Sequence, residues 1–260
     1  MATFQLNPWL VCLRQVPKAQ YRLFCIPFAG GDFSIFLTWP DFLPPQAEVF
    51  GVELPGSLRR MSEKPLTDME PLVDGLARAL LPHLDLPFAI FGSCTGSFSA
   101  FELVLKIRAL CGREPAHLYC SSVWAPHLPS RHPPIHRLPK KDFIQSLDHL
   151  GAIPRETLAQ PELVQVLLPA IRADFKVAET YTPVNGAQVH CPLTTFCGTN
   201  DPMVLAEEAA AWEEETTGPF QLLMLEGDHN LWKTSRETML STIKEDMRTH
   251  LDTNRENILI

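Results

Sequence analysis

The sequence lacks any apolar run that approaches the roughly 20 residues needed by a membrane-spanning helix. Residues 1–20 show no basic start followed by a long apolar stretch, so a signal peptide is not expected. The seven cysteines include no Cys-x-x-Cys pair, and an odd number without close pairs does not make a disulfide framework. These absences predict a cytoplasmic protein, in a reducing compartment, with no membrane partner.

Basic residues are too few for a nucleic-acid-binding surface. Lys and Arg number 22 against 30 Asp and Glu, and the formal net charge of −8 argues against a nucleic-acid partner. Apolar residues make up 45% and charged residues 20%, as in ordinary globular proteins, and 260 residues can bury a substantial core. We expect a monomer.

No pattern of metal ligands stands out either. His127, His132 and His136 share one short segment, but that segment is rich in proline and contains neither cysteine nor a paired carboxylate. Metal sites in proteins normally need such additional ligands. We therefore predict neither a metal site nor a cofactor bound by the chain itself.

Six short apolar runs predict β-strands. Most are continuously apolar, which is typical of strands buried on both faces of a parallel sheet. One intervening helix is predicted to open with the capping-box signature Thr67-Asp-Met-Glu70 and to end near His83. Others are predicted from Cys94 to about Ala109 and over 205–216 and 231–250. The strand runs are 21–27, 47–54, 88–92, 117–122, 193–198 and 220–225.

The alternation of strands and helices predicts an α/β fold, with a mostly parallel twisted sheet flanked by helices. Alternation stops over residues 125–183, which begin with a proline-rich stretch and continue as amphipathic segments at 138–150 and 161–181. We predict a core of residues 1–124 and 184–260, with 125–183 inserted as a helical lid subdomain over the site. A fixed subdomain is the alternative interpretation.

Residues 92–96, G-S-C-T-G, lie between an apolar strand and a helix. This is the layout of a nucleophile elbow with cysteine in the serine position. The positions two before and two after the nucleophile crowd together, and Gly92 and Gly96 occupy them around Cys94. Ser93 does not fit, because Phe91 would take one of these small positions. Cys94 is therefore the candidate nucleophile, and a buried structural cysteine is the alternative.

Two further residues complete a candidate triad in the chain order nucleophile, acid, histidine. Asp201 follows the strand run 193–198, and His229 follows the run 220–225, so both are expected at the carboxyl edge of the sheet. His229 would transfer protons while Asp201 orients its ring. Asp201 could instead be only a turn former before Pro202, and Asp228 is a rival orienter of the ring.

An oxyanion formed at a carbonyl carbon needs backbone N–H donors. One is expected from Thr95, directly after the nucleophile. The second is expected from Ala29 or Phe28 in the segment I-P-F-A-G-G (26–31), whose glycines let the backbone approach a substrate closely. A simple turn is equally consistent with that segment when it is taken alone.

Together these segments resemble the type II thioesterases of polyketide and nonribosomal-peptide synthesis, which belong to the α/β-hydrolase superfamily. The resemblance runs from about Tyr21 to Met247 and includes the lid and loops as well as the elbow. It implies an α/β-hydrolase fold and an acyl or aminoacyl substrate on the phosphopantetheine arm of an acyl- or peptidyl-carrier protein. The similar segments are 26–31, 54–56 (L-P-G), 88–96, 125–129, 168–174, 198–201 and 227–229.

One position departs from this family, whose elbow reads G-H-S-M-G. Transfer of an acyl group to Cys94 would give another thioester, which stays activated toward water, an amine, a carbon nucleophile or a second thiol. The resemblance therefore implies a thioesterase that releases the acyl group by hydrolysis, with an acyltransferase or cyclase in natural-product biosynthesis as the alternative. A non-catalytic carrier-binding protein is the second alternative.

A basic cluster opens the predicted lid, against the acidic balance of the whole chain. It comprises Arg131, Arg137, Lys140 and Lys141, with two histidines among them. Carrier proteins of this kind are usually acidic, so the resemblance implies that the cluster docks the carrier by charge. A solvated surface loop is the alternative.

Overall fold

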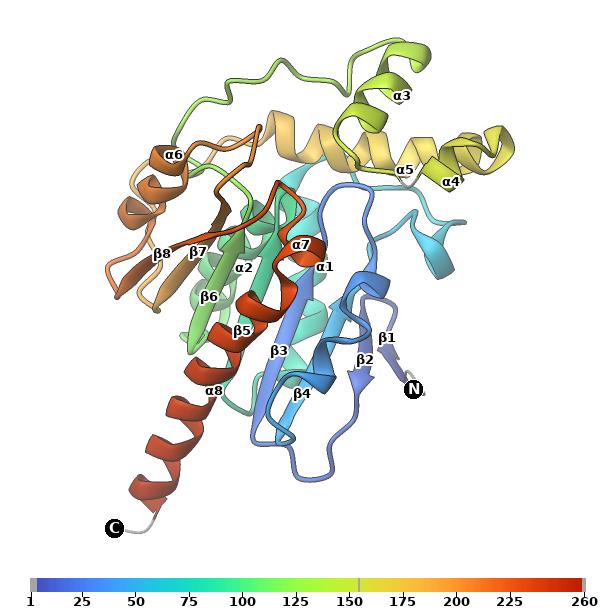
Figure 1. Ribbon diagram of the computed structural model, residues 1–260. Coiled ribbons are helices and arrows are strands. Elements are labelled where there is room, and N and C mark those ends of the chain that lie inside the picture. Colours follow the sequence, from blue (N-terminus) through green and yellow to red (C-terminus); the bar gives the residue numbers. More distant parts are fainter. Residues whose placement is uncertain (1–3, 154, 259–260) are drawn as a thin grey trace.

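The computed structural model describes residues 4–153 and 155–258. Its centre is an eight-stranded, mostly parallel sheet with helices on both faces, as predicted (Figure 1). The strand order across the sheet is β1-β2-β4-β3-β5-β6-β7-β8. The six expected strands are all present, as β3 (Tyr21–Ile26), β4 (Ala47–Val52), β5 (Phe88–Ser93), β6 (His117–Ser121), β7 (Leu193–Gly198) and β8 (Phe220–Leu225).

Burial follows the position of each strand in the sheet. Strands β4, β5 and β7 are buried at every residue, because helices cover both faces of the sheet there. Strand β8 is equally apolar in sequence, but it is the last strand at its edge, and Met224 is 40% exposed. The apolar runs thus predicted the strands, but they did not distinguish an exposed edge strand from a buried central strand of the sheet.

Two strands were not predicted. Strands β1 (Phe4–Asn7) and β2 (Leu10–Arg14) form a hairpin, and β2 pairs antiparallel with β4. The side-chain oxygen of Asn7 accepts hydrogen bonds from the backbone N–H groups of Trp9 and Leu10 at 2.9 and 3.1 Å, which closes the turn. The Asn-Pro pair between two short apolar runs was the available signal.

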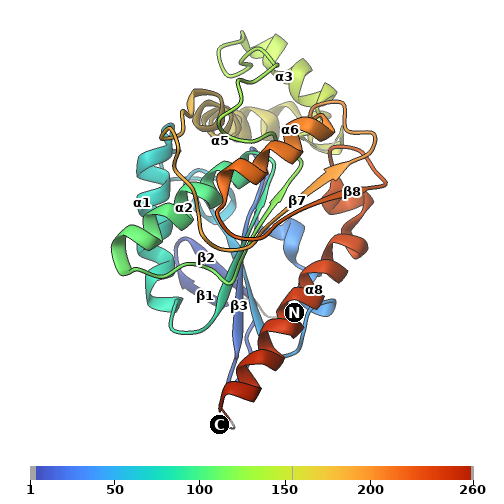
Figure 2. The ribbon, with the colours of Figure 1, turned by 90° about the vertical axis from the view of Figure 1, so that its left-hand side faces the viewer.

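Helices form a layer on each face of the sheet, which Figure 2 shows from the side. Helices α1 (Met69–Leu80) and α2 (Thr95–Cys111) cover one face, and α8 (Arg236–Ile258) covers the other. Leu76 and Val104 belong to the core of the first face, while Leu240 and Ile243 belong to that of the second. The central strands of the sheet are thus covered on both faces, so a site open to substrate is expected at the ends of the strands.

Three helix predictions need correction. The capping box at Thr67–Glu70 is wrong: the N-cap of α1 is Asp68, no side chain caps the helix, and the Thr67 hydroxyl donates to Asp68 instead. The segment 205–216 divides into α6 (Ala206–Ala210) and a 3₁₀ helix, Ala211–Glu215. The last predicted helix, 231–250, is divided at Ser235 into α7 (Leu231–Thr234) and α8.

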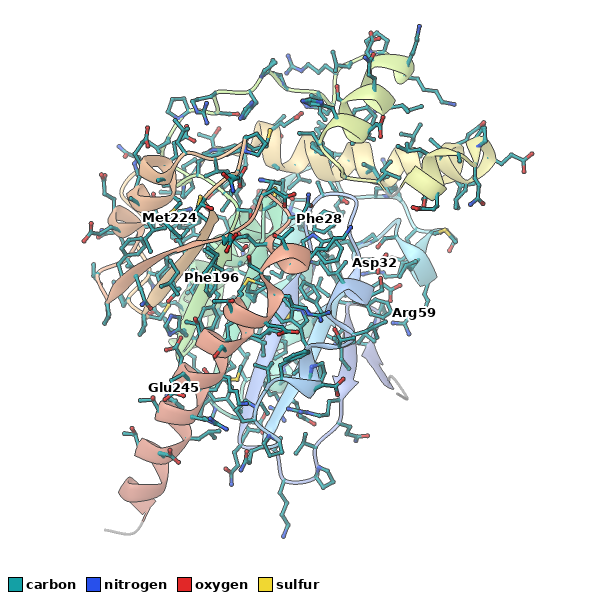
Figure 3. All side chains as sticks on the ribbon, viewed as in Figure 1. Phe28, Asp32, Arg59, Phe196, Met224 and Glu245 are labelled. Carbon is teal, nitrogen blue, oxygen red and sulfur yellow. The ribbon has the colours of Figure 1, made fainter. Side chains whose placement is uncertain are left out.

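Between β6 and β7 the chain forms α3 (Lys140–His149), α4 (Arg155–Leu158) and α5 (Pro161–Thr180). These helices lie across the carboxyl end of the strands, above Phe28 (Figure 3). They share a small apolar core in which Phe143 and Leu147 of α3 pack with Val164, Leu168 and Ile171 of α5. The division into a core and a lid subdomain remains a prediction. Among the described helices, none is long and apolar enough to cross a membrane.

Candidate active site

The turn between β5 and α2 presents the side chain of Cys94 at the carboxyl end of the sheet. Cys94 has φ 48° and ψ −121°, a conformation that L-residues rarely adopt. A Cβ on Gly92 would lie 2.4 Å from Cα of Ser97, and one on Gly96 would lie 2.4 Å from the carbonyl oxygen of Pro27. Only glycine fits these two positions, so the crowding expected of an elbow is present around a strained residue.

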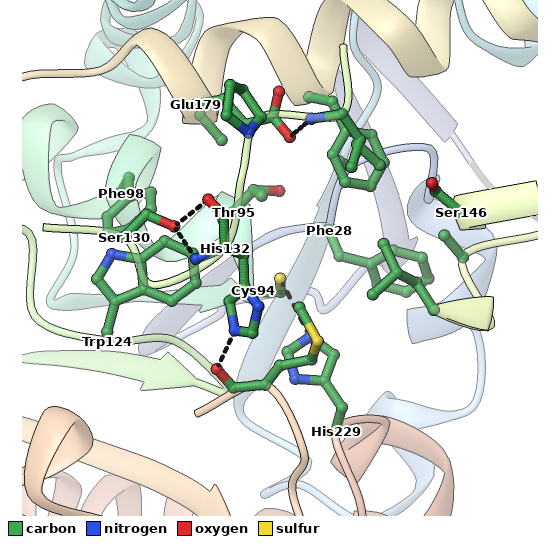
Figure 4. A pocket seen from close by; sticks show the side chains of 18 of the residues that line it. Phe28, Cys94, Thr95, Phe98, Trp124, Ser130, His132, Ser146, Glu179 and His229 are labelled. Carbon is green, nitrogen blue, oxygen red and sulfur yellow. Dashed lines mark hydrogen bonds between the residues drawn. The ribbon is translucent and has the colours of Figure 1, made fainter. Parts of the chain in front are cut away.

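The imidazole of His229 lies beside the Cys94 thiol. Its Nε2 is 3.3 Å from Sγ of Cys94, and Figure 4 shows the two side chains meeting at the wall of a cavity. Cys94 is partly exposed to that cavity, whereas Cys25, Cys120 and Cys197 are buried in the core. A structural role for Cys94 in the apolar interior does not agree with this position.

Asp201 faces the other nitrogen of the same ring. Its two carboxylate oxygens lie 2.9 and 3.1 Å from Nδ1 of His229, and its side chain is wholly buried. A carboxylate can only accept, so we assign the ring proton to Nδ1. The N–H groups of Met203 and Val204 donate to Asp201 at 2.8 and 3.2 Å and fix the carboxylate. Asp228 instead accepts from the backbone N–H of Asn230.

The surroundings of His229 favour its cationic form. Burial alone would lower the pKa of the imidazole, but the negative charge available at Cys94 and the hydrogen bond to Asp201 outweigh burial, and the pKa of His229 is raised above 6.5. The arrangement therefore lets the ring hold a proton beside Cys94, whose sulfur is the candidate nucleophile.

The loop after β3, residues 27–31, lies against the start of α2, since Gly96 leaves no room for a Cβ beside Pro27. We call it the oxyanion loop. The N–H of Gly30 donates to Asp174 at 2.9 Å, and the N–H of Gly31 donates to the carbonyl of Phe28 at 2.8 Å. These two donors are already engaged. Phe28, Ala29 and Thr95 line the cavity with Cys94, and their roles as oxyanion donors remain a prediction.

The cavity beside Cys94 and His229 has a volume of about 1390 Å³ and reaches from the elbow to the lid helices. The Phe28 ring stacks on Trp232, with centroids 5.8 Å apart, at its floor. Polar groups on its far wall already have backbone partners: Nε2 of His132 lies 2.9 Å from the Met203 carbonyl, and Glu179 accepts the N–H of Ile135 (Figure 4). The space accommodates a large, mostly apolar group.

The three histidines of the proline-rich segment do not converge on one point. His127 contacts Glu215 at 2.6 Å, whereas His136 contacts Glu179. Within residues 4–153 and 155–258, no group of three possible ligands could hold a metal ion. In the basic cluster, Arg131 pairs with Glu208, while Arg137, Lys140 and Lys141 are exposed.

Sequence reasoning did not single out Asp174. Its carboxylate reaches the oxyanion loop from helix α5, 144 residues further along the chain. The segment 168–174 had entered only as part of the resemblance in the lid. An acidic residue within an amphipathic helix carries no signal that would predict such a distant backbone partner.

Known proteins resemble this chain over nearly its whole length. The model of the thioesterase domain family matches residues 21–247. The gramicidin S biosynthesis protein GrsT of Aneurinibacillus migulanus is 37% identical over 244 residues, which cover 94% of this chain and 95% of that protein. The medium-chain S-acyl fatty acid synthase thioesterase of Homo sapiens is 33% identical, over 84% of this chain and 83% of that protein.

Solved structures agree with the fold. The type II thioesterase BorB from the borrelidin biosynthetic cluster superposes with a TM-score of 0.86 at 32% identity, over 94% of this chain and 99% of that chain. RedJ, a thioesterase from the prodiginine pathway in Streptomyces coelicolor, superposes with a TM-score of 0.81 at 33% identity, over 88% of this chain and 86% of that chain. The predicted α/β-hydrolase fold is confirmed.

Proposed function

We propose a reaction for this chain from one premise: it belongs to the thioesterase family. The proposed substrate is an acyl or aminoacyl thioester on the phosphopantetheine arm of a carrier protein, and the proposed outcome is hydrolytic release. The names of the relatives support this choice, because GrsT takes part in gramicidin S biosynthesis and BorB is a type II thioesterase of a biosynthetic cluster. The chain would thus act as a type II thioesterase of nonribosomal-peptide or polyketide synthesis.

The contact between Cys94 and His229, at 3.3 Å, is the observation that carries the proposal. The Cys94 thiolate attacks the thioester carbonyl carbon, and the carbonyl electron pair moves onto oxygen. The N–H groups of Thr95 and of Ala29 or Phe28 then stabilise the oxyanion. When the intermediate collapses, the bond to the pantetheine sulfur breaks, and that sulfur takes a proton from the His229 imidazolium. An acyl group remains on Cys94.

Hydrolysis completes the cycle with the same groups. A water molecule gives a proton to the now neutral His229 while its oxygen bonds to the acyl carbon. The bond to Cys94 breaks, and the sulfur leaves as a thiolate beside the imidazolium. The carboxylic acid departs, and Asp201 keeps the ring in one orientation through both steps.

The sulfur at position 94 favours a second candidate function. An acyl group on sulfur remains a thioester, so its passage to a second thiol is nearly balanced in energy, and its passage to an amine or carbon nucleophile is favourable. The cavity of about 1390 Å³ beside Cys94 has room for such an acceptor as well as the acyl group. An acyltransferase or cyclase on the same residues is therefore the alternative to hydrolysis.

The partner would dock beside the cavity mouth. Lys140 and Lys141 begin α3, and Asp142, next along the chain, lines the cavity. With Arg137 they present exposed positive charge, whereas the charge of Arg131 is shared with Glu208. An acidic carrier would meet this surface first. We also propose that the chain works as a monomer in the cytoplasm, a compartment that suits its seven free thiols.

Mixing the protein with an acyl-loaded carrier tests the proposal. Intact-mass analysis would follow Cys94, and chromatography would follow the released acid, with Cys94→Ala as the control. Free acid released through a transient adduct supports hydrolysis. A lasting adduct that leaves only when an amine or second carrier is added supports transfer. If neither an adduct nor turnover is detected, the proposal is overturned, and the non-catalytic carrier-binding role remains.

A further inference from the structure

Two side chains of helix α5 in the lid, Asp174 and Ile171, contact the same residue of the oxyanion loop, Gly30. The backbone N–H of Gly30 donates to Oδ2 of Asp174 at 2.9 Å. One helical turn earlier, Ile171 packs against the same residue, since a Cβ on Gly30 would lie 3.2 Å from its side chain. Gly30 also has φ +80°, so only the glycine backbone fits this contact easily.

Asp174 is a costly residue for this position. Burial raises the pKa of its carboxyl group to about 7, and the hydrogen bond from Gly30 opposes that shift. Within the described part of the chain, no basic side chain contributes to this pKa, although the residue keeps partial solvent contact. A carboxyl group whose main compensation is one backbone donor contributes little to stability. The contact of Asp174 with the oxyanion loop explains the presence of a carboxyl group here better than stability does.

The other side of the oxyanion loop is fixed by the nucleophile helix. Gly96 lies against the carbonyl oxygens of Ile26 and Pro27, so the loop is held between α2 and α5. A small cavity of about 20 Å³ is lined by Asp174 together with Ala29 and Thr95. Asp174 and the candidate donor residues therefore border the same small space. A shift of the loop by a fraction of an ångström would move Ala29 relative to Thr95.

We propose that Asp174 is a positioning residue, which fixes the oxyanion loop through Gly30 and so keeps the two backbone donors aligned for the reaction at Cys94. The inference rests on the proposed acyl transfer to Cys94. Asp174 acts on the rate of the chemical step rather than on the reactivity of the thiol, because its contact is with the loop and not with Cys94 or His229. Helix α5 thereby links the lid to the electrostatics of the site.

Three variants separate this role from simple packing. Asp174→Leu removes the acceptor and keeps the branching of the side chain, and Asp174→Asn keeps an oxygen that can accept from Gly30 without a charge. Asp174→Ala also removes the acceptor, and its smaller side chain avoids the added bulk of leucine. Glu162→Leu is the matched control, since it removes an exposed carboxylate from the same helix.

The measurements are kcat and KM for a small acyl thioester, the rate at which iodoacetamide alkylates Cys94, and the melting temperature. We expect Asp174→Leu and Asp174→Ala to lower kcat at least about tenfold, less than the roughly 10²–10³-fold effect of deleting a donor outright. KM and the alkylation rate should stay within about twofold, and Asp174→Asn should restore most of kcat. Glu162→Leu should leave all values unchanged.

The outcomes distinguish this inference from the proposed function. Wild-type turnover together with an unchanged kcat in Asp174→Leu and Asp174→Ala would overturn the inference alone. So would an alkylation rate that falls in parallel with kcat, or an Asn variant as slow as the Leu and Ala variants, because those results indicate a general disturbance of the fold. Wild-type protein without turnover or acyl adduct would overturn the proposed function and the inference together.

Discussion

Asp201 holds the His229 ring with both carboxylate oxygens, 2.9 and 3.1 Å from Nδ1. The carboxylate is itself fixed by the backbone N–H groups of Met203 and Val204. This buried carboxylate therefore fixes the tautomer of the ring that faces Cys94 and, together with Cys94, favours the charged form of the ring. This relationship predicts how the activity should depend on pH.

Asp201→Asn should lower kcat by on the order of 10³–10⁴-fold, because an amide no longer enforces the correct tautomer. Desolvation lowers the pKa of His229, and Cys94 and Asp201 together raise it above its ordinary value. Loss of the Asp201 charge lets that pKa fall, so the cation that protonates the leaving thiol disappears at a lower pH. The alkaline limb of kcat should therefore move toward lower pH.

The pH profile of kcat, measured on a small thioester, checks the direction of this shift. Asp228→Asn is the comparison, because Asp228 is the rival orienter and contacts the backbone of Asn230 instead. It should leave the alkaline limb where it is. If Asp228→Asn moves that limb and Asp201→Asn does not, the assignment of the orienting carboxylate is wrong.

Cys94→Ser should change the fate of the acyl group more than it changes binding. An acyl group on serine is an oxygen ester, which a thiol acceptor attacks unfavourably. Transfer to a second thiol should fall relative to hydrolysis by at least about tenfold, equivalent to about 1.4 kcal/mol. Neutral hydroxylamine followed by intact mass checks the adduct: rapid loss is expected from the wild type and slow loss from the variant. Equal lability in both would argue that the adduct is not on residue 94.

The residues of the candidate triad were predictable because their positions follow from local rules. Cys94 has glycines at both crowded positions of the turn, and Asp201 and His229 each follow an apolar strand run. The chain order nucleophile, acid, histidine then predicts the role of each residue. The structure brings these three side chains together within hydrogen-bonding distance.

Other features depend on contacts that local patterns do not encode. Asp174 meets Gly30 across 144 residues, and periodicity in α5 predicts a buried face but not its partner. The hairpin of β1 and β2 consists of four- and five-residue strands without a crossover helix. The hydroxyl of Thr67 donates to its neighbour Asp68 and not to the helix. The sequence motif of a capping box is therefore present, but the capping hydrogen bond that it predicts is not made.

Charge reversal in the basic cluster should affect carrier-bound substrate selectively. The double variant Lys140→Glu/Lys141→Glu should raise KM for an acyl carrier protein several-fold at low salt and leave KM for a small thioester unchanged. The effect should shrink at high ionic strength, because the charges are exposed. Steady-state kinetics at two salt concentrations measures both. Lys18→Glu, an exposed charge reversal before β3, is the control. Equal changes for both substrates would remove the docking role.

Gly96→Ala should damage stability and activity together, because its new Cβ would lie 2.4 Å from the carbonyl oxygen of Pro27. Relief requires the oxyanion loop or the start of α2 to move, and such overpacking costs about 1–3 kcal/mol of unfolding free energy. Gly112→Ala is the matched comparison at the other end of α2. Its φ of +69° also disfavours alanine, at a cost of about 1–2 kcal/mol, but nothing lies within 4 Å of its Cβ.

Urea unfolding and kcat measured on the same preparations separate these two effects. Gly112→Ala should lose stability and keep the wild-type kcat, because the strain stays at the end of the helix away from Cys94. Gly96→Ala should lose both, since displacement of the oxyanion loop would also move Ala29, one of the proposed oxyanion donors. A Gly96→Ala variant with wild-type kcat would mean that the loop tolerates displacement, and that its contact with α2 does not set the geometry of the oxyanion donors.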